Sequence, residues 1–532
     1  MIQKVAVLDM DLQKYKDKLL HFSKRANKLY IYGAGNYGKG YFDVLQHNKC
    51  NVDGFIVTKK YSKEYLGRPV YSIEEISEKI SSEDGIIPAF TNSNVEEIAG
   101  MFLCSSPQIL DFDHRLMLCL ENEIHFFPLM DKLDEGFPVV EQKVDTSQWN
   151  DILIVRLDVI GDIVFTTPFI RELRRNFPEG HVSVVIRKQN QKMLEDCPYI
   201  DELFLYDGEL SDGELAEQSQ NYYRLSGKIR KFADERFQSR NFDVVFFPRE
   251  LLCGRNTIDE LLIAYYSGAR YRIGRMWVDE VDRRLVCERL NKSFTMICNP
   301  SSPMHEAAYA LEMLRQCGCM VEDERMELWT GSQSEMRISR LLQEHSVEER
   351  HILIALGIVA SVDTRTWRTE NYNSIIRHYG GQYGAHIRFI IMGGEDAVDA
   401  AEQVDDSFSN VVNLAGKTAL DETIACMKRC HLYVGSNTGL LHFASAWGVP
   451  SVTIYSELSD GEPTDGDSPF RMGAWKVPHI DLVPPAGLDG CHGVCRMRFS
   501  HCINQITPTQ VIHAIDEMLN LKCAEERETI HG

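Results

Sequence analysis

The sequence predicts an α/β protein with three consecutive domains, each built around a mostly parallel sheet. The chain has 532 residues, and single hydrophobic cores stop growing near about 250 to 300 residues, so several domains are expected. Short, nearly continuous apolar runs alternate with helical stretches along most of the chain, as in doubly wound sheets. The composition, 44% hydrophobic and 25% charged, is that of an ordinary globular protein.

Charge and cysteine usage narrow the class of partner and the compartment. Lys plus Arg is 57 and Asp plus Glu is 78, giving a net charge of −21 that disfavours binding to nucleic acid. The 15 scattered cysteines favour reduced thiols in a cytoplasmic protein. No signal core and no membrane-length apolar run is found. If the substrate is lipid-linked, we expect peripheral contact with the inner face of the membrane.

The first predicted domain covers residues 1–145. A helix is expected over about residues 1–22, followed by a strand at Leu29–Tyr32, a glycine-rich turn, a helix through Gln46 and a second strand over 51–57. Further on, residues 85–90 resemble a strand and residues 94–101 a helix.

The turn Gly33-Ala-Gly35-Asn-Tyr-Gly38 matches the fingerprint of dinucleotide-binding folds. The acidic residue that would bind a ribose is missing at the end of the second strand, where Val57, Thr58 and Lys59 stand. Three hypotheses for Gly33, Gly35 and Gly38 therefore stay open. The turn binds NAD(P), it binds a different nucleotide sugar, or it is a tight turn with a purely structural role.

The second predicted domain covers residues 146–346 and begins with a buried strand at 151–157. Strands are expected at 181–186, 203–206 and 243–247, and helices at 169–176, 220–240 and 334–344. Asp162 follows Gly161 in the turn after the first strand. It is a candidate general base, and the competing hypothesis is that it only caps the following helix.

The third predicted domain covers residues 347–532, with strands at 351–356, 388–392, 411–414, 432–434 and 451–455. After the fourth of these strands, the small-residue turn Gly435–Gly439 opens a helix, and such a turn can bind a diphosphate through free N–H groups and the helix dipole. Asn437 and Thr438 could equally be ordinary N-caps, and His442 an ordinary core histidine.

Two polar loops follow other strands of this domain. Arg365 would offer a permanent positive charge to phosphate, and its alternative is a solvated surface charge. Glu395 follows Gly393-Gly394, where a carboxylate could bind sugar or ribose hydroxyls, or simply favour a helix N-terminus.

Taken together, the motifs resemble the ADP-heptose:lipopolysaccharide heptosyltransferases over about residues 151–520. The ordered set is Gly161-Asp162, Thr166-Thr-Pro168, Arg365-Thr-Trp367, Gly393-Gly-Glu395, Leu414-Ala-Gly-Lys-Thr418 and Gly435-Ser-Asn-Thr-Gly-Leu-Leu-His442. The resemblance implies a GT-B fold of two Rossmann-like domains, here preceded by a smaller Rossmann-like domain.

The same resemblance implies inverting, metal-independent transfer of a heptose from ADP-heptose to a hydroxyl of a lipopolysaccharide core or related cell-surface glycan. Asp162 would be the catalytic base. Donor-binding residues would be Arg365, Glu395, Lys417, Asn437, Thr438, Gly439 and His442. Arg365 replaces the family's lysine, and Asn437 stands where many relatives have an aspartate.

Two other function classes stay open at this stage. One is an NAD(P)-dependent sugar-nucleotide oxidoreductase or epimerase that works through the N-terminal domain, and the other is a non-catalytic glycan-binding scaffold. A zinc site at Cys491, Cys495 and Cys502 is also considered, although the spacing of these cysteines is not a standard one.

Overall fold

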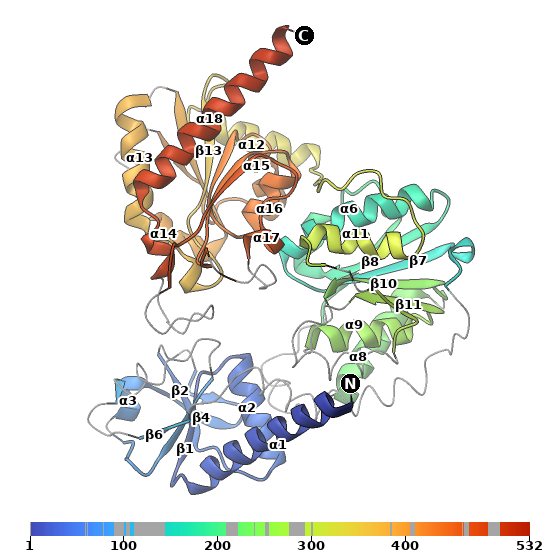
Figure 1. Ribbon diagram of the computed structural model, residues 1–532, viewed down its shortest axis with the longest axis vertical. Helices are drawn as coiled ribbons and strands as arrows, with labels where there is room; N and C mark the ends of the chain where they lie inside the picture. Colours follow the sequence, from blue (N-terminus) through green and yellow to red (C-terminus); the bar gives the residue numbers. More distant parts are fainter. Residues whose placement is uncertain are drawn as a thin grey trace. The chain divides into compact units, whose positions relative to one another are not determined.

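The computed structural model (Figure 1) divides into two compact units, residues Met1–Val155 with Tyr206–Asn299, and Arg156–Leu205 with Pro300–Gly532. It describes residues 2–58, 60, 62–77, 79–89, 101–102, 107–110, 144–208, 222–238, 240–250, 255–275, 293–298, 300, 302–383, 386–404, 410–459, 461, 468–487 and 501–531. Among these residues, no helix has the length and apolar character needed to cross a bilayer.

The N-terminal sheet has six strands in the order β3-β4-β2-β1-β5-β6, parallel except for the β3–β4 pair. Its elements are α1 (Ile2–Arg25), β1 (Leu29–Tyr32), α2 (Asn36–His47), β2 (Gly54–Val57), β3 (Glu64–Tyr65), β4 (Arg68–Ser72), α3 (Ile73–Ser77), β5 (Gly85–Pro88) and β6 (Gln108–Ile109).

The predicted β-α-β unit around the glycine-rich turn is confirmed. β2 begins at Gly54 rather than at residue 51, because Asp53 is occupied at the preceding corner: its Oδ2 accepts the Leu29 N–H at 2.9 Å. The helix expected at 94–101 lies outside the described residues, apart from its last position.

A second six-stranded sheet has the order β12-β11-β10-β7-β8-β9. Its strands are β7 (Asp151–Arg156), β8 (His181–Arg187), β9 (Glu202–Tyr206), β10 (Val244–Glu250), β11 (Tyr271–Arg275) and β12 (Met296–Cys298). The helical segments between them include α6 (Ile160–Asn176), η2 (Lys188–Met193), α8 (Tyr222–Phe237) and α9 (Arg255–Tyr266), and α11 (Glu306–Gln316) follows β12. Four of these elements, α9, β11, β12 and α11, were not predicted from the sequence.

Helix α6 starts nine residues earlier than predicted, at Ile160 instead of Phe169, so that Pro168 lies inside it. A proline there removes the N–H that would bond the carbonyl of residue 164. The Thr167 hydroxyl replaces it, donating to the Val164 carbonyl at 2.8 Å. The Thr166 hydroxyl likewise donates to the Asp162 carbonyl at 3.1 Å. These threonines explain how the helix continues through the proline.

The C-terminal sheet is fully parallel, in the order β15-β14-β13-β16-β17-β18. Its strands are β13 (Ile352–Gly357), β14 (Ile387–Met392), β15 (Val411–Asn413), β16 (Leu432–Ser436), β17 (Ser451–Ile454) and β18 (His479–Leu482). The first five were predicted within about two residues. Because the chain order reverses between β13 and β16, a ligand site is expected where these two strands end.

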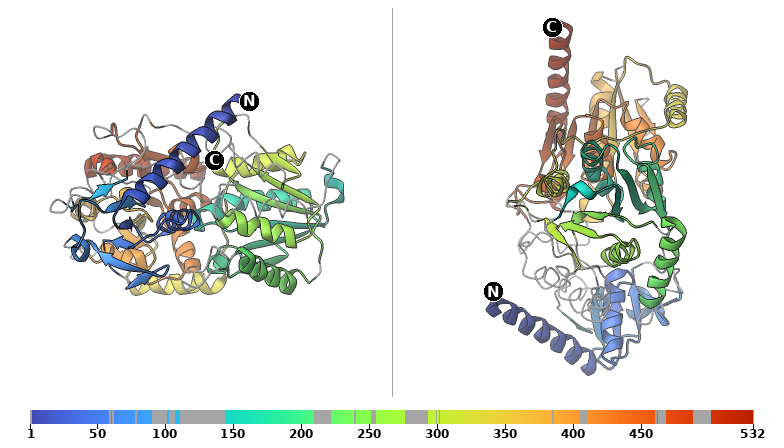
Figure 2. Two further views of the ribbon diagram at one scale, coloured as in Figure 1. Left: turned by 90° about the horizontal axis from the view of Figure 1, so that it is seen from below. Right: turned by 90° about the vertical axis from the view of Figure 1, so that its right-hand side faces the viewer.

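Helices cover both faces of this sheet. They are α12 (Ser332–Glu344), α13 (Thr369–Tyr383), α14 (Val398–Ala401), α15 (Leu420–Met427), α16 (Gly439–Ala446), α17 (Pro469–Met472) and α18 (Pro508–His531). α18 packs on α13 and on β17 and β18, and its C-terminal part continues past the sheet (Figure 2). α16 packs against β16 and β17.

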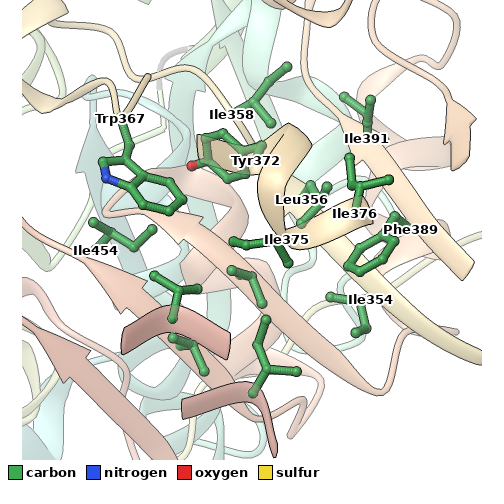
Figure 3. Close-up of a cluster of buried hydrophobic side chains, with 14 of the residues drawn as sticks. Ile354, Leu356, Ile358, Trp367, Tyr372, Ile375, Ile376, Phe389, Ile391 and Ile454 are labelled. Atoms are coloured by element: carbon green, nitrogen blue, oxygen red, sulfur yellow. The ribbon is translucent and has the colours of Figure 1, made fainter. Parts of the chain in front are cut away.

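One large core lies on the α13 and α18 face of the sheet (Figure 3). Trp367 is fully buried there, with its ring 5.0 Å from that of Tyr372, and its Nε1 donates to the Ile506 carbonyl at 3.0 Å. The Tyr372 hydroxyl donates to the carbonyl of Gly357 at 3.1 Å. Trp367 therefore anchors the loop that leaves β13, and with it the position of Arg365.

Candidate functional site

Two strand-to-helix turns meet in the second compact unit, the β7–α6 turn and the β16–α16 turn. A side-chain Cβ added to Gly161 would lie 2.7 Å from Cδ2 of His442, and one added to Gly439 would lie 3.5 Å from Cγ2 of Ile160. The first turns of α6 and α16 are thus in direct contact. Glycine at position 161 is required by this approach, not by an unusual backbone angle.

Asp162 lies in the first turn of α6, and its side chain is 27% exposed. The residue at the N-cap is Val159, which makes no side-chain capping bond and is itself 69% exposed. Asp162 is therefore not the N-cap residue of α6. Its Oδ1 lies 3.3 Å from Nη2 of Arg156, whose side chain is buried at the end of β7. A carboxylate in this position is accessible and held beside a fixed positive charge.

The start of α16 also lacks a side-chain cap, although its N-cap residue is Thr438. The Tyr433 hydroxyl lies 3.3 Å from Thr438 Oγ1 and donates to the Ser436 carbonyl at 2.7 Å. The helix-start N–H groups are left without a side-chain acceptor. Since such groups and the helix dipole attract negative charge, the paired starts of α6 and α16 form a surface suited to an anion.

His442 is buried between α16 and α6. Its ring centroid lies 4.3 Å from that of Phe165, and its Nδ1 has no hydrogen-bond partner among the described residues. Burial, with a smaller contribution from His305, lowers the pKa of His442 to about 3. The ring is therefore neutral near pH 7. In this structure it packs the two helix starts together, which is the arrangement expected of a core histidine.

A second histidine extends this contact. His305 caps α11 by accepting the Ala307 N–H at 3.2 Å, its Nε2 lies 3.0 Å from the Gly473 carbonyl, and its ring stacks on Trp475 with centroids 4.2 Å apart. Burial lowers its pKa to about 4. Neither His305 nor Trp475 was predicted from the sequence, because no local pattern marks them.

The other predicted donor-binding residues follow the carboxyl ends of neighbouring strands. Arg365 ends the short helix η4 (Asp363–Arg365) after β13 and is half-buried, and Glu395 opens η5 (Glu395–Ala397) after β14 and is exposed. Lys417 follows β15, is exposed, and donates from Nζ to the Asn413 carbonyl at 3.0 Å. Asn437 follows β16. Because β15, β14, β13 and β16 are adjacent in that order, all four residues lie along one edge of the sheet.

The loops after β14 and β15 contact each other directly. The Gly416 N–H donates to the Gly393 carbonyl at 3.0 Å, and Gly416 has a φ of 67°, which glycine adopts without strain. This bond brings the loop of Lys417 beside that of Glu395. These positions thus lie on one side of the sheet, and the two loops touch through their backbones.

The N-terminal glycine turn has the geometry of the fingerprint. Gly33 has a φ of 122° and its N–H donates to the Ile56 carbonyl at 2.9 Å, and a Cβ on Gly38 would lie only 2.0 Å from the Gly33 carbonyl oxygen. A Cβ on Gly35 would meet nothing within 4 Å. Asp53 lies at the opposite end of the strands, bonded to Leu29. The described residues offer no carboxylate after β2 for a ribose.

The cysteines considered for zinc are only partly visible. Cys491 and Cys495 lie outside the described residues, and Cys502 is buried with its Sγ 3.0 Å from Nδ1 of His501. Over the part of the chain that the structure describes, no three His, Cys, Asp or Glu side chains gather as a metal site would require.

Comparison with known proteins agrees with this description. Residues 319–464 match the model of glycosyltransferase family 9 (heptosyltransferase). Lipopolysaccharide heptosyltransferase 3 of Escherichia coli is 22% identical over 304 residues, which cover 56% of this chain and 80% of that protein.

Solved structures show the same fold. A family 9 glycosyl transferase from Veillonella parvula superposes with a TM-score of 0.55 at 20% identity, covering 71% of this chain and 98% of that one. The E. coli ADP-heptose lps heptosyltransferase II superposes with a TM-score of 0.50 at 16% identity, covering 70% and 99%. The chain therefore shares the GT-B fold of these glycosyltransferases, with a further Rossmann-like domain at its N-terminus. The part of the chain that matches glycosyltransferase family 9 (heptosyltransferase) is residues 319–464.

Proposed function

We propose that this enzyme transfers a heptose from ADP-heptose to a hydroxyl of a lipopolysaccharide core or related cell-surface glycan, inverting the anomeric centre without a metal ion. The observation that supports this most directly is the contact between the two helix starts, with the accessible Asp162 carboxylate on one and the uncapped N–H groups of α16 on the other. The donor and acceptor are those named for the E. coli relatives.

Asp162 is the proposed general base. A sugar hydroxyl is a weak nucleophile, so a carboxylate within hydrogen-bond reach has to accept its proton as the oxygen attacks the anomeric carbon. The bond from that carbon to the diphosphate oxygen breaks on the opposite side, and its electron pair leaves with ADP. One displacement of this kind inverts the configuration, which is why a single carboxylate suffices.

The departing ADP gains negative charge, and the second set of groups is proposed to stabilise it. The N–H groups at Thr438 and Gly439 offer hydrogen bonds and a positive helix end, and Arg365 adds a permanent charge. Glu395 and Lys417, on the touching loops after β14 and β15, are proposed to contact the sugar or ribose hydroxyls. Asn437 would contact the donor through its amide. His442 would not contact the donor; it would pack the starts of α6 and α16 together.

The domain organisation in this proposal is residues 1–145, 146–346 and 347–532, with the acceptor bound by the second domain and the donor by the third. If the acceptor is lipid-linked, the enzyme would work at the inner face of the membrane. The N-terminal domain has no assigned chemical step in this scheme.

The test is release of free nucleoside diphosphate from a panel of ADP-, GDP- and UDP-sugars that includes ADP-heptose, with lipid-core acceptors and with or without EDTA. We expect turnover of ADP-heptose that survives EDTA. In Asp162→Asn, kcat should fall by roughly 10²- to 10⁴-fold, the usual contribution of general base catalysis, while ADP binding measured by calorimetry is retained. Full activity in Asp162→Asn would exclude this residue as the base, and turnover of another donor alone would exclude ADP-heptose.

A further inference from the structure

The residue that precedes the β7–α6 turn, Arg156, carries a buried charge that the reaction scheme above does not use. Its side chain is only 2% exposed, at the carboxyl end of β7. The guanidinium lies between two carboxylates: Nε is 3.2 Å from Oδ2 of Asp158, and Nη2 is 3.3 Å from Oδ1 of Asp162. A buried charge is costly unless it is paired, so this arrangement requires an explanation.

The backbone of the same turn is fixed from the neighbouring segment. Nε of Arg187 donates to the Leu157 carbonyl at 2.8 Å, and Nδ2 of the buried Asn190 donates to the Asp158 carbonyl at 3.0 Å. Two of the three carbonyls between Arg156 and α6 are therefore held by side chains of β8 and η2. The turn is built as a rigid support, and what it supports is the first turn of α6.

A carboxylate in a first helical turn retains freedom about its side-chain torsions, and the last of these has a broad energy profile. A planar guanidinium restricts that freedom because its N–H groups point in fixed directions. The Asp158 carboxylate lies on the Nε side of the group; no hydrogen bond joins Nε to Oδ2, so Asp158 attracts Arg156 by charge. The chain Asp158–Arg156–Asp162 therefore determines which way the Asp162 carboxylate points.

We propose that Arg156 is a positioning residue for the general base: it holds Oδ1 of Asp162 so that Oδ2 accepts the proton of the acceptor hydroxyl, with Asp158 fixing the guanidinium from its other side. The inference rests on the proposed role of Asp162. In the step, the acceptor O–H bond breaks and its proton moves to Oδ2, the acceptor oxygen bonds to the anomeric carbon, and ADP leaves with the electron pair of the broken bond. Arg156 changes neither protonation state nor bonding.

The competing explanation is that the ion pair only stabilises the fold. The two differ in a double-mutant cycle, because a residue that acts through Asp162 loses its effect on catalysis once Asp162 is changed. The variants are Arg156→Lys, Asp162→Asn and the double variant. Lysine keeps the charge but not the planar fork, and so cannot hold both carboxylates in the same geometry.

In Arg156→Lys we expect kcat with ADP-heptose to fall roughly 10- to 100-fold, the range that small misplacements of a catalytic group produce. The dissociation constant for ADP, measured by calorimetry, should stay within about twofold of wild type, since the donor loops are untouched. In the Asp162→Asn background, measured in single turnovers with enzyme in excess, the same substitution should lower the rate less than about threefold.

Arg171→Lys is the matched control. Arg171 is also a buried arginine that bridges carboxylates, with Nε 3.0 Å from Oε1 of Glu172 and Nη1 2.8 Å from Oε1 of Glu327. It lies nine residues beyond Asp162 along α6. That separation is about 14 Å at 1.5 Å per residue. Its substitution should lower the melting temperature and leave kcat near wild type.

Asp158→Asn provides a second route if the Arg156 variants fold poorly. Removing this carboxylate frees one side of the guanidinium, so we expect a smaller loss of kcat, roughly 3- to 10-fold, that also disappears in the Asp162→Asn background. Two results would overturn the positioning role. One is a loss of kcat that is equal in the wild-type and Asp162→Asn backgrounds. The other is a loss of kcat that only follows the fall in melting temperature, judged against Arg171→Lys. Full activity of Asp162→Asn would instead remove the general base itself, so the two failures can be told apart.

Discussion

Two turns of this chain share one local design and differ in what surrounds them. In the N-terminal domain, β1 leads through Gly33, Gly35 and Gly38 into α2, and further along the chain β7 leads through Gly161 into α6. At the first turn, glycine is needed for a contact inside the turn itself, because Gly38 packs against the carbonyl of Gly33. At the second it serves a contact with another helix, since Gly161 meets His442 of α16.

The difference in chemistry is sharper than the difference in shape. The β7–α6 turn has an accessible carboxylate, a buried arginine behind it and a second helix start beside it. The β1–α2 turn has open space at Gly35, and its nearest strand-end carboxylate, Asp53, lies at the opposite end of the strands. A strand–glycine–helix turn is therefore a scaffold that acquires a function only from the side chains placed around it.

The largest expected effect comes from adding a side chain at the contact between the starts of α6 and α16. In Gly161→Ala, the new Cβ would lie 2.7 Å from the ring of His442, which is only 5% exposed. We expect kcat to fall roughly 100-fold, as for displacements of about 1 Å near a reacting group. Steady-state kinetics with ADP-heptose measures this. Unchanged kinetics would show that the contact between α6 and α16 is not needed for turnover.

The corresponding change in the N-terminal turn should lower stability and leave kcat unchanged. A Cβ in Gly38→Ala would lie 2.0 Å from a backbone carbonyl oxygen, which cannot rotate away. We expect a loss of about 1–3 kcal/mol, the usual cost of overpacking, together with kcat close to wild type. Urea unfolding followed beside turnover separates the two quantities. A loss of kcat at retained stability would give this domain a catalytic role that the proposed scheme lacks.

Acid should destabilise the second compact unit through its buried histidines. The folded-state pKa values of His442 and His305 are depressed to about 3 and about 4, below an unfolded value near 6.5, so the unfolded chain binds more protons. Stability is thus complete above pH 6.5 and declines as the pH falls toward 4. The slope is at most about 1.4 kcal/mol per pH unit for each histidine.

Urea unfolding at pH 7, 6 and 5 tests this dependence, with His442→Phe as the comparison. Phenylalanine cannot be protonated, so the slope between pH 6.5 and 4 should become shallower in the variant. An unchanged slope would mean that other groups determine the acid sensitivity. Histidine protonation should not affect the N-terminal turn, because the only histidine within Leu29–His47 is His47, at the end of α2.

Sequence reasoning located five of the six strands of the C-terminal sheet, because these buried parallel strands are short apolar runs bounded by small or polar residues. It missed β11, which is buried and parallel but contains two arginines. It failed at α6, where a helix was expected only from Phe169 although the helix begins at Ile160. The compensation for Pro168 by Thr167 was visible only once the hydroxyl was seen on the Val164 carbonyl. It also missed β18, whose run His479–Leu482 alternates polar and apolar residues and follows no clear turn signal.

At the site, the motif order grouped positions that the structure places along one edge of the sheet, because residues following adjacent parallel strands share that edge. Arg156 was overlooked since an arginine ending an apolar run resembles a strand terminus. His305 and Trp475 are far from the motifs in sequence and reach the site only through tertiary packing. Long-range contacts of this kind leave no local pattern.

The smallest expected effect distinguishes the two turns at their most open point. Gly35 is the N-cap of α2 with a φ of −98°, which alanine can adopt, and nothing lies within 4 Å of an added Cβ. Alanine is a poorer N-cap than glycine, but it also reduces the freedom of the unfolded chain, and these two contributions of about 0.5–1 kcal/mol oppose each other. Gly35→Ala should therefore leave the free energy of unfolding and kcat nearly unchanged. A clear loss of turnover at unchanged stability would show instead that a ligand approaches this backbone closely, and would make the two turns functionally alike.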